Sequence, residues 1–429
     1  MSGVLHVGEN SGILFEPGRL FADSRYAAFA VAAVAAVEKG DAGPISEELE
    51  KEKRRASSSG RGEEAPAHEI AAFAISTQGL SAMVARGAGL EAVPPPLALF
   101  LLEEISRSRS RANRLQETLG SVVCALRAAG VEVVALKGAV LAFFHYPDPA
   151  LRPMGDLDLL LTDPADLARA TEALGGAGWR ALLDTPRHRV FVRPDERVVR
   201  PAAEHPGNPI RVEIHTSFRL PVLGRVFDAS AALRDEAEAR DLGGTRVNVA
   251  AGSALLTHLL FHAAEDFAGN GIRGIQAHDF RLLAKAHGAL ALEISGDSVK
   301  ISSSGRGAAD ARGAAPLLCA ADAIERLFPL TFKEIFLSSL SSRVSPELRA
   351  RAAALPSLRY TRPARGWTHT LLSLVDGPVP RARFLLRTLF PPFGEVKANA
   401  APNASGLTLV LAWARVLARR VSSALGVRP

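Results

Sequence analysis

The chain has 429 residues, of which 48% are hydrophobic and 22% charged, and its formal net charge is +6. This length is large for one compact core, so we expect at least two folded parts. Two cysteines are too few for a disulfide framework or a tetrahedral zinc site. The positive charge is compatible with phosphate-rich ligands, although it does not identify one.

No segment of the sequence reads as a membrane span or as an export signal. The longest apolar stretch, residues 27–37, is shorter than the roughly 20 residues that cross a bilayer. The N-terminal residues also lack a basic segment followed by a long apolar run. We therefore expect a cytoplasmic protein without a transmembrane helix.

Composition separates two segments from the rest of the chain. Residues 38–69 contain the charged run EELEKEKRR, and residues 293–315 are rich in Ser, Gly, Asp and Ala. Such compositions favour flexible surface loops. We therefore assign residues 1–70 to an N-terminal extension with a disordered insertion at about 38–69, and we expect a second flexible insertion at about 293–315.

Residues 71–130 have a helical pattern. Leu115, Leu119 and Val122 follow one another at spacings of four and three, which places them on one helical face. Gly130 is a typical residue just past a helix end. The β-branched run at 131–136 that follows predicts a short buried strand.

Helix and strand then alternate. A helix is expected at 139–146, ending at Pro147, and a second strand at 156–161. Asp163 is positioned to cap the next helix, with Pro164 at its first position. Short runs between 179 and 218, separated by Pro, Gly and Asn, predict antiparallel strands, and the pattern beyond Leu220 is helical.

These elements predict an α+β protein. Residues 71–110 are assigned to a helical N-terminal region and 111–220 to a small mixed sheet with helices. Residues 221–429 are assigned to an α-helical C-terminal domain.

Two carboxylates lie in the second predicted strand. Side chains two residues apart in a strand point to the same side, so Asp156 and Asp158 project together. Crowded carboxylates repel one another unless a cation neutralises them, and oxygen ligands suit Mg²⁺. Glu213, in the strand-like run RVEIH, supplies a third metal ligand if its strand lies beside that of Asp156.

A second motif, Lys137-Gly138, lies where the first strand meets a helix. Glycine allows a phosphate to approach the backbone, and the N–H groups at a helix start point toward it. Alone, a glycine turn and an Asp-x-Asp pair are common structural features. Together they indicate a metal site beside a phosphate site.

The run ALKGAVLAFFHYPDPALRPMGDLDLLL, residues 135–161, resembles a known group of sequences. It is similar to the uncharacterised nucleotidyltransferases of the DNA polymerase β-like superfamily, through the Lys-Gly turn, the Tyr-Pro segment and Arg-Pro-Met-Gly-Asp-Leu-Asp. Weaker similarity extends from about residue 70 to about 425. The resemblance implies a polymerase β-like catalytic domain.

The resemblance also implies roles for individual residues. Asp156, Asp158 and Glu213 are the implied catalytic residues and the ligands of one or two Mg²⁺ ions. A second set is assigned to the nucleotide: Lys137, Gly138, Arg152 and Gly155. Ala139 stands where the superfamily usually has Gly or Ser, and Thr216 stands where the group commonly has Trp.

The implied reaction is attack by an acceptor hydroxyl on the α-phosphate of a nucleoside triphosphate, such as ATP, with release of pyrophosphate. The acceptor is not defined by these motifs; a small molecule, a protein side chain and an RNA end all carry suitable hydroxyls. A catalytically silent nucleotide-binding protein is a nonenzymatic alternative.

A rival enzymatic interpretation rests on histidines in the helical part. His258 and His262 are four residues apart, and Glu265 and Asp266 follow. With His278-Asp279 they could form the His-Asp site of a metal-dependent phosphohydrolase. We favour packing and hydrogen bonding as their roles, because this region matches the helical part that follows the catalytic domain in the resembled family.

Overall fold

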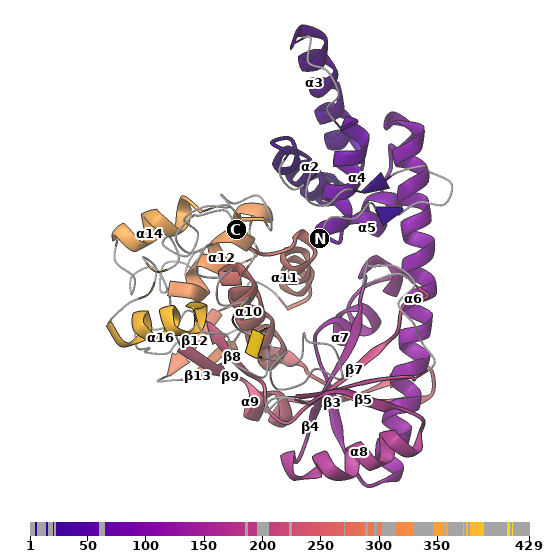
Figure 1. Ribbon diagram of the computed structural model, residues 1–429, viewed down its shortest axis with the longest axis vertical. Helices are drawn as coiled ribbons and strands as arrows, with labels where there is room; N and C mark the ends of the chain where they lie inside the picture. The colour runs from indigo at the N-terminus through magenta and orange to yellow at the C-terminus, as the bar shows by residue number, and fades with distance from the viewer. Residues whose placement is uncertain are drawn as a thin grey trace.

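The computed structural model has a mixed α/β architecture that combines a seven-stranded sheet with many helices (Figure 1). The structure describes residues 5–6, 14–15, 20, 23–59, 65–184, 188–194, 206–222, 225–269, 271–287, 291–295, 298–302, 315–329, 331, 346–355, 357–358, 372, 375, 378–389, 410–411 and 414.

The large sheet is mixed, with strand order β10-β11-β3-β4-β7-β6-β5. Its pairs are antiparallel except for β11 with β3 and β4 with β7, which are parallel. The strands are β3 (Val133–Ala135), β4 (Asp156–Leu161), β5 (Arg180–Asp184), β6 (His188–Val192), β7 (Arg211–His215), β10 (Glu238–Leu242) and β11 (Thr245–Val249). The predicted strands at 131–136 and 156–161 are confirmed.

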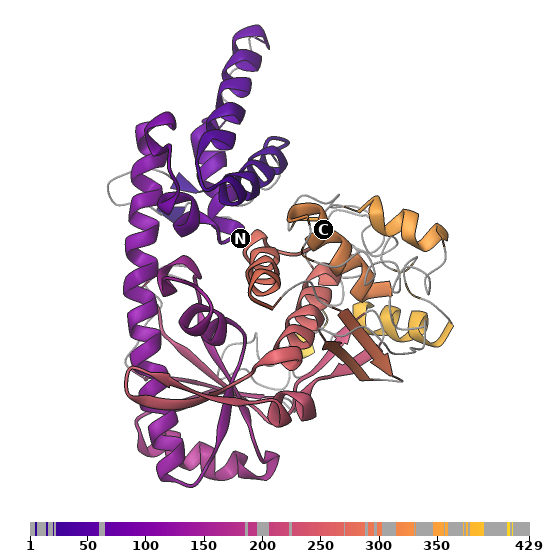
Figure 2. The ribbon, with the colours of Figure 1, turned by 180° about the vertical axis from the view of Figure 1, so that it is seen from behind.

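One long helix, α6 (Pro95–Ala128), runs along one side of the molecule, and α3 (Gly43–Ser59) extends beyond its upper end (Figures 1 and 2). Its C-terminal half contacts β4, β11 and helix α8 (Leu167–Gly176), and Leu115, Leu119 and Val122 are buried on one face as predicted. Helix α7 (Lys137–Phe144) and the 3-10 turn η2 (Pro149–Leu151) link β3 to β4. Asp163 accepts a hydrogen bond from the Ala165 N–H, which confirms the predicted cap at η3 (Pro164–Asp166).

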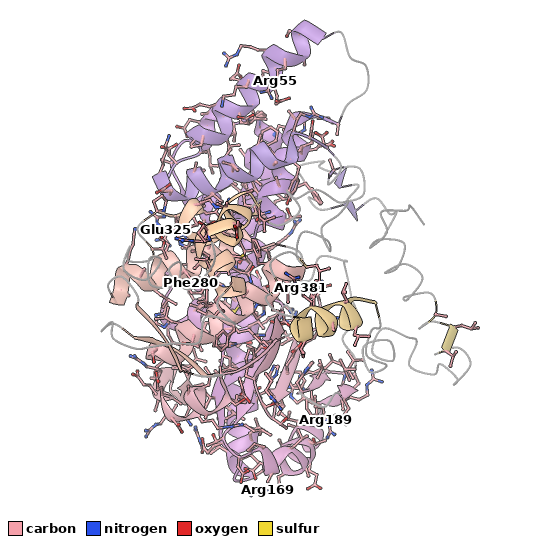
Figure 3. The ribbon with its side chains drawn as sticks, turned by 90° about the vertical axis from the view of Figure 1, so that its left-hand side faces the viewer. Arg55, Arg169, Arg189, Phe280, Glu325 and Arg381 are labelled. Carbon is pink, nitrogen blue, oxygen red and sulfur yellow. The ribbon has the colours of Figure 1, made fainter. Side chains whose placement is uncertain are left out.

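The N-terminal part is helical around the first half of α6. It comprises β1 (Leu5–His6), β2 (Leu14–Phe15), α2 (Tyr26–Lys39), α3 (Gly43–Ser59), α4 (Ala67–Thr77), α5 (Ser81–Arg86) and η1 (Leu90–Ala92). Arg55 near the tip of α3 and Arg169 of α8 lie at opposite ends of the molecule (Figure 3).

Helix α3 corrects the expected flexible loop at 38–69. Ile45 and Leu49, one turn apart, are buried in the core, which anchors the start of this helix. Along its exposed face, the charged run forms ion pairs three residues apart, including Lys51 with Glu48 at 3.0 Å. The alternating charges therefore support a helix, and only residues 60–64 of this segment lie outside the described chain.

The sheet extends beyond residue 220, where we expected the α/β part to end, because the hairpin β10–β11 adds to it. The remaining elements are mostly helical. They are β8 (Arg219–Val222), β9 (Arg225–Asp228), α9 (Ser230–Asp235), α10 (Gly252–Gly269), α11 (Gly274–His287), β12 (Ala291–Ser295), β13 (Ser298–Ser302), α12 (Ala315–Leu327), α14 (Pro346–Ala353) and α16 (Pro378–Leu389).

The second expected flexible insertion, residues 293–315, is corrected in its first part. Strands β12 and β13 pair antiparallel as a hairpin with Glu293 opposite Lys300. Residues 303–314 lie outside the described chain. Within the described chain, no helix is both long and apolar enough to cross a bilayer.

Candidate active site

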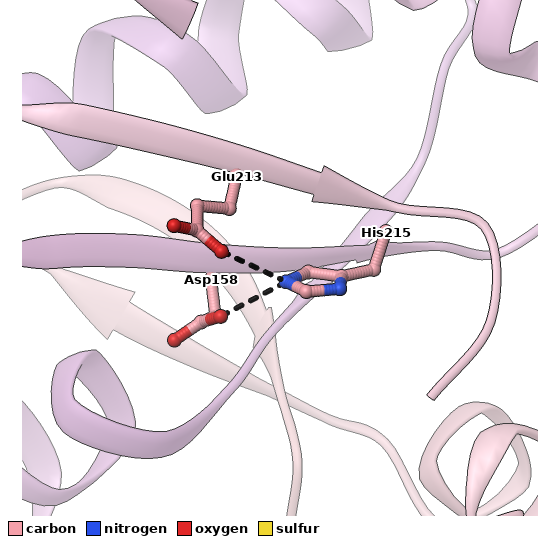
Figure 4. Close-up of side chains that lie close together, drawn as sticks. All are labelled: Asp158, Glu213 and His215. Carbon is pink, nitrogen blue, oxygen red and sulfur yellow. Dashed lines mark hydrogen bonds and ion pairs between the residues drawn. The ribbon is translucent and has the colours of Figure 1, made fainter. Parts of the chain in front are cut away.

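Strands β4 and β7 bring two of the three predicted carboxylates, Asp158 and Glu213, together, while Asp156 lies at the start of β4 outside this group. The two strands are parallel neighbours, with Asp156 opposite Arg211 and Asp158 opposite Glu213. The predicted adjacency of these strands is therefore confirmed. Asp158 and Glu213 face one another across the pair, and His215 closes the group (Figure 4).

Asp158, Glu213 and His215 form a group able to hold a metal ion, since one ligand atom of each lies within 4.8 Å of the others. His215 Nε2 lies 2.9 Å from Asp158 Oδ1 and 3.7 Å from Glu213 Oε2. The sequence analysis did not select His215. The signal was present, because His215 is two residues after Glu213 and therefore points to the same side of β7.

Lys137 provides a cation to this cluster. Its Nζ lies 3.0 Å from Asp158 Oδ1. Its φ of +46° makes it the one non-glycine residue with positive φ in the described chain. A left-handed conformation costs about 1–2 kcal/mol for an L-residue, and such strain is typical of functional sites. The turn that we expected to seat phosphate therefore also directs a lysine at the carboxylates.

The two aspartates of β4 differ in their pKa. Burial alone would raise the pKa of Asp158, but the Lys137 ammonium and the hydrogen bond from His215 hold it well below its ordinary value. Asp156 lies at the exposed start of β4. Loss of solvation and the Asp158 charge raise the pKa of Asp156, against the influence of Lys137 and Arg152.

Glu213 lies beside two histidines, His188 and His215. His188 Nε2 is 3.8 Å from Glu213 Oε2, and the His188 and His215 rings stack with centroids 5.1 Å apart. Burial and the charges of Asp158 and Asp156 raise the pKa of Glu213 to about 7. A cation bound next to such a carboxyl group stabilises its ionised form.

The affinity of the protein for Mn²⁺, a spectroscopic substitute for Mg²⁺, will fall about tenfold from pH 8 to pH 6. A metal ligand must be deprotonated, and in the folded protein Glu213 takes up its proton as the pH falls through about 7. Electron paramagnetic resonance titration measures the free ion. The Glu213→Gln variant should bind weakly and without this pH step, whereas equal wild-type affinity at both pH values would contradict the assignment.

Arg152 and Gly138 lie against one another near this cluster. A Cβ added to Gly138 would lie only 3.0 Å from Arg152 Nη1 and 3.1 Å from Met154 Cγ. Arg152 also donates to Asp279 of α11 through Nε at 3.3 Å and Nη2 at 2.9 Å. The Tyr146 hydroxyl donates to the same carboxylate at 2.8 Å. The sequence analysis missed this link, by which Asp279 orients Arg152.

Gly155 contributes its carbonyl oxygen. That oxygen accepts a hydrogen bond of 2.7 Å from Nη2 of Arg111, a buried side chain of α6. Arg111 also donates to the carbonyls of Asn208 and Pro209, which precede β7. One guanidinium therefore holds the chain at the start of both strands that carry the carboxylates.

The histidines of the rival interpretation lie on two helices. His262 Nδ1 is 3.0 Å from Asp266 Oδ2 on α10, and the His258 ring packs against Phe218. On α11, the His278 ring lies 5.7 Å from that of Tyr146. Across the described residues, the group suited to a metal is Asp158, Glu213 and His215, and these histidines belong to no other such group.

Comparison with known proteins identifies the family of the chain. A family model described as uncharacterised nucleotidyltransferase matches residues 66–293, which is more than half of the chain. No curated protein and no solved structure was found to match. The matched range contains α7, β4, β7, α10 and α11. The predicted family is thus confirmed, and the chain belongs to the uncharacterised nucleotidyltransferases, enzymes that transfer phosphorus-containing groups.

Proposed function

We propose that the protein transfers a nucleoside monophosphate from a nucleoside triphosphate to a hydroxyl acceptor, with Mg²⁺ held by Asp156, Asp158 and Glu213. We further propose that the sheet and its helices form a polymerase β-like catalytic domain, with the helical C-terminal part as the opposite wall of the cleft. The mixed sheet with its carboxylates on two parallel neighbours supports this assignment.

The charge of the cluster is the observation that carries the proposal. The carboxylates of Asp156, Asp158 and Glu213 carry a formal charge of −3 when all are ionised. The Lys137 ammonium reduces this charge to −2, which a divalent cation balances. The raised pKa values of Asp156 and Glu213 support this balance, because their ionised forms are disfavoured in the protein without a bound cation. Carboxylate oxygens suit Mg²⁺, and His215 is also compatible with Mn²⁺.

The other residues are assigned to the nucleotide and the proton. Lys137 and Arg152 offset phosphate charge, and Gly138 lets a phosphate reach the start of α7. Bound metal lowers the pKa of the acceptor hydroxyl and neutralises phosphate charge. Asp158 or Glu213 receives the hydroxyl proton; the acceptor oxygen bonds to the α-phosphorus, and the bond to the pyrophosphate oxygen breaks.

The test is incubation of α-labelled nucleoside triphosphates with Mg²⁺, the protein and cell extract, followed by separation of small molecules, protein and RNA. Label should appear in one of these fractions with the wild type and disappear with Asp156→Asn. Asp163→Asn is a matched control, because the same change at the η3 cap leaves the site intact.

Two outcomes would overturn the proposal. Label transferred equally by Asp156→Asn would remove the role of the carboxylates. Magnesium-dependent nucleotide binding without any labelled acceptor would favour the silent binding protein. For the phosphohydrolase alternative, the diagnostic result is bound metal that is lost in His262→Ala but kept in Asp158→Asn.

A further inference from the structure

Helix α10 and Lys137 contact the same aromatic ring, that of Phe218. The His258 ring is fully buried, and its centroid lies 3.9 Å from that of Phe218, just beyond β7. On the same Phe218 ring, Lys137 Nζ lies 5.2 Å from the centroid. This contact fixes one turn of α10 against the carboxylate cluster and thereby sets where the next turn lies.

His262 occupies that next turn. Residues four apart lie on one helical face, about 6 Å along the axis, so His262 extends the face that begins at His258. Unlike His258, its side chain is 28% exposed. His262 is therefore accessible to a ligand from solvent, whereas His258 is enclosed by protein.

A chain of hydrogen bonds fixes the His262 ring. Asp266 Oδ2 lies 3.0 Å from His262 Nδ1 and accepts a bond of 2.6 Å from Gln276 Nε2. The Arg273 N–H donates to Gln276 Oε1 at 2.8 Å. An ionised carboxylate only accepts hydrogen bonds, so Nδ1 carries a proton toward Asp266. The ring is held by one nitrogen, and Nε2 points away from Asp266.

The ring also carries charge near the site. Burial would lower the pKa of His262, but the Asp266 and Glu265 carboxylates outweigh it and raise this pKa. The positive charge of His262 lowers the pKa of Asp156 on β4. The positive charge of Lys137 in turn lowers the pKa of His262. An imidazolium at this position on the helical wall is therefore electrostatically coupled to the cluster.

We propose that His262 binds the polyphosphate of the nucleotide, its Nε2–H donating a hydrogen bond to a phosphate oxygen while Nδ1–H stays on Asp266. Asp266 and Gln276 are positioning residues in this arrangement. The inference rests on the proposed function, because the nucleotide must be held at Asp156, Asp158 and Glu213. A ring that lies one turn beyond His258 on α10 and is oriented by a carboxylate suits an anionic ligand.

The test uses Mg²⁺ with inorganic tripolyphosphate and with a nonhydrolysable nucleoside triphosphate analogue, and calorimetry measures both dissociation constants. His262→Ala should weaken each about tenfold, the value of one charge-assisted hydrogen bond. His262→Gln, which retains a donor, should recover part of the loss. Asp266→Asn keeps the ring but removes the negative charge that holds it, and should give an intermediate loss.

Controls separate this contact from a structural role. His262→Ala should still bind Mn²⁺ without nucleotide and no more weakly than the wild type, because it loses a positive charge near the carboxylates, and this shows that the carboxylate site is intact. His68→Gln, a half-buried histidine on α4, should behave as the wild type. Wild-type polyphosphate affinity in His262→Ala would overturn the inference alone, whereas a wild type that binds no Mg²⁺–nucleotide would overturn the proposed function with it.

Discussion

Replacing Glu213 by glutamine will increase the free energy of unfolding of the metal-free protein and abolish nucleotidyl transfer. Folding raises the pKa of Glu213 from 4.5 to about 7, so above pH 7 the folded state bears the full cost of ionising it. At 1.36 kcal/mol per pKa unit, with some loss to relaxation, the neutral amide should stabilise the protein by about 1–3 kcal/mol. Urea unfolding with EDTA at pH 8 measures the change.

Two comparisons test the cause. The increase in the free energy of unfolding caused by Glu213→Gln should shrink as the pH falls through 7. It should be lost near pH 4.5, where Glu213 is already protonated in the folded protein. Asp158→Asn should have the opposite sign, because this carboxylate is stabilised by Lys137 at 3.0 Å and by His215 at 2.9 Å. Removing one partner of a buried pair destabilises by about 3–5 kcal/mol, less where other carboxylates remain nearby.

The two variants thus separate stability from activity. Both should lose Mg²⁺-dependent transfer, while only Asp158→Asn should unfold at a lower urea concentration. Destabilisation by Glu213→Gln at pH 8 would show that this carboxylate is not strained in the metal-free protein, and the charge argument for a cation at the cluster would fail with it.

The parts of the site that are local in sequence could be predicted. The alternation in Asp-Leu-Asp follows from the two-residue period of a strand, and β4 has the predicted bounds. Asp163 followed by Pro164 predicted the observed cap, for the same local reason. The pairing of β4 with β7 was a hypothesis, based on the expectation that three carboxylates bind the same metal site. The register, with Asp158 opposite Glu213, confirms the pairing.

Features that depend on distant contacts could not be predicted. Helix α3 has a surface composition typical of a loop, and it is the burial of Ile45 and Leu49 against other helices that selects the helix. The hairpin β10–β11 joins the sheet only through its pairing with β3, more than 100 residues earlier. Asp279 of α11 likewise orients Arg152 only because the fold brings the two residues, distant in sequence, into hydrogen-bonding contact.

Arg111 is the clearest case of a residue whose role sequence could not reveal. It lies in the run SRSRANR of α6, which reads as the basic surface of a helix. In the structure it is 1% exposed and donates to the carbonyls of Gly155, Asn208 and Pro209. It thereby ties the residues before β4 to those before β7, the two strands that carry the carboxylates.

Replacing Arg111 by methionine will destabilise the protein by about 3–5 kcal/mol, because several buried carbonyls lose their donor at about 1–3 kcal/mol each. Lysine should recover only part of this, since a single ammonium does not reproduce the planar fork that spans both segments. Urea unfolding measures the loss, and Mn²⁺ titration of the lysine variant should show weakened binding because the two strands are no longer held together.

The matched control is Arg107→Lys, one turn earlier on α6. Arg107 forms ion pairs with Glu103 and Glu104, and this change should alter the free energy of unfolding by less than about 1 kcal/mol. If Arg111→Lys bound Mn²⁺ as tightly as the wild type, the register of β4 and β7 would be set by their backbone pairing alone.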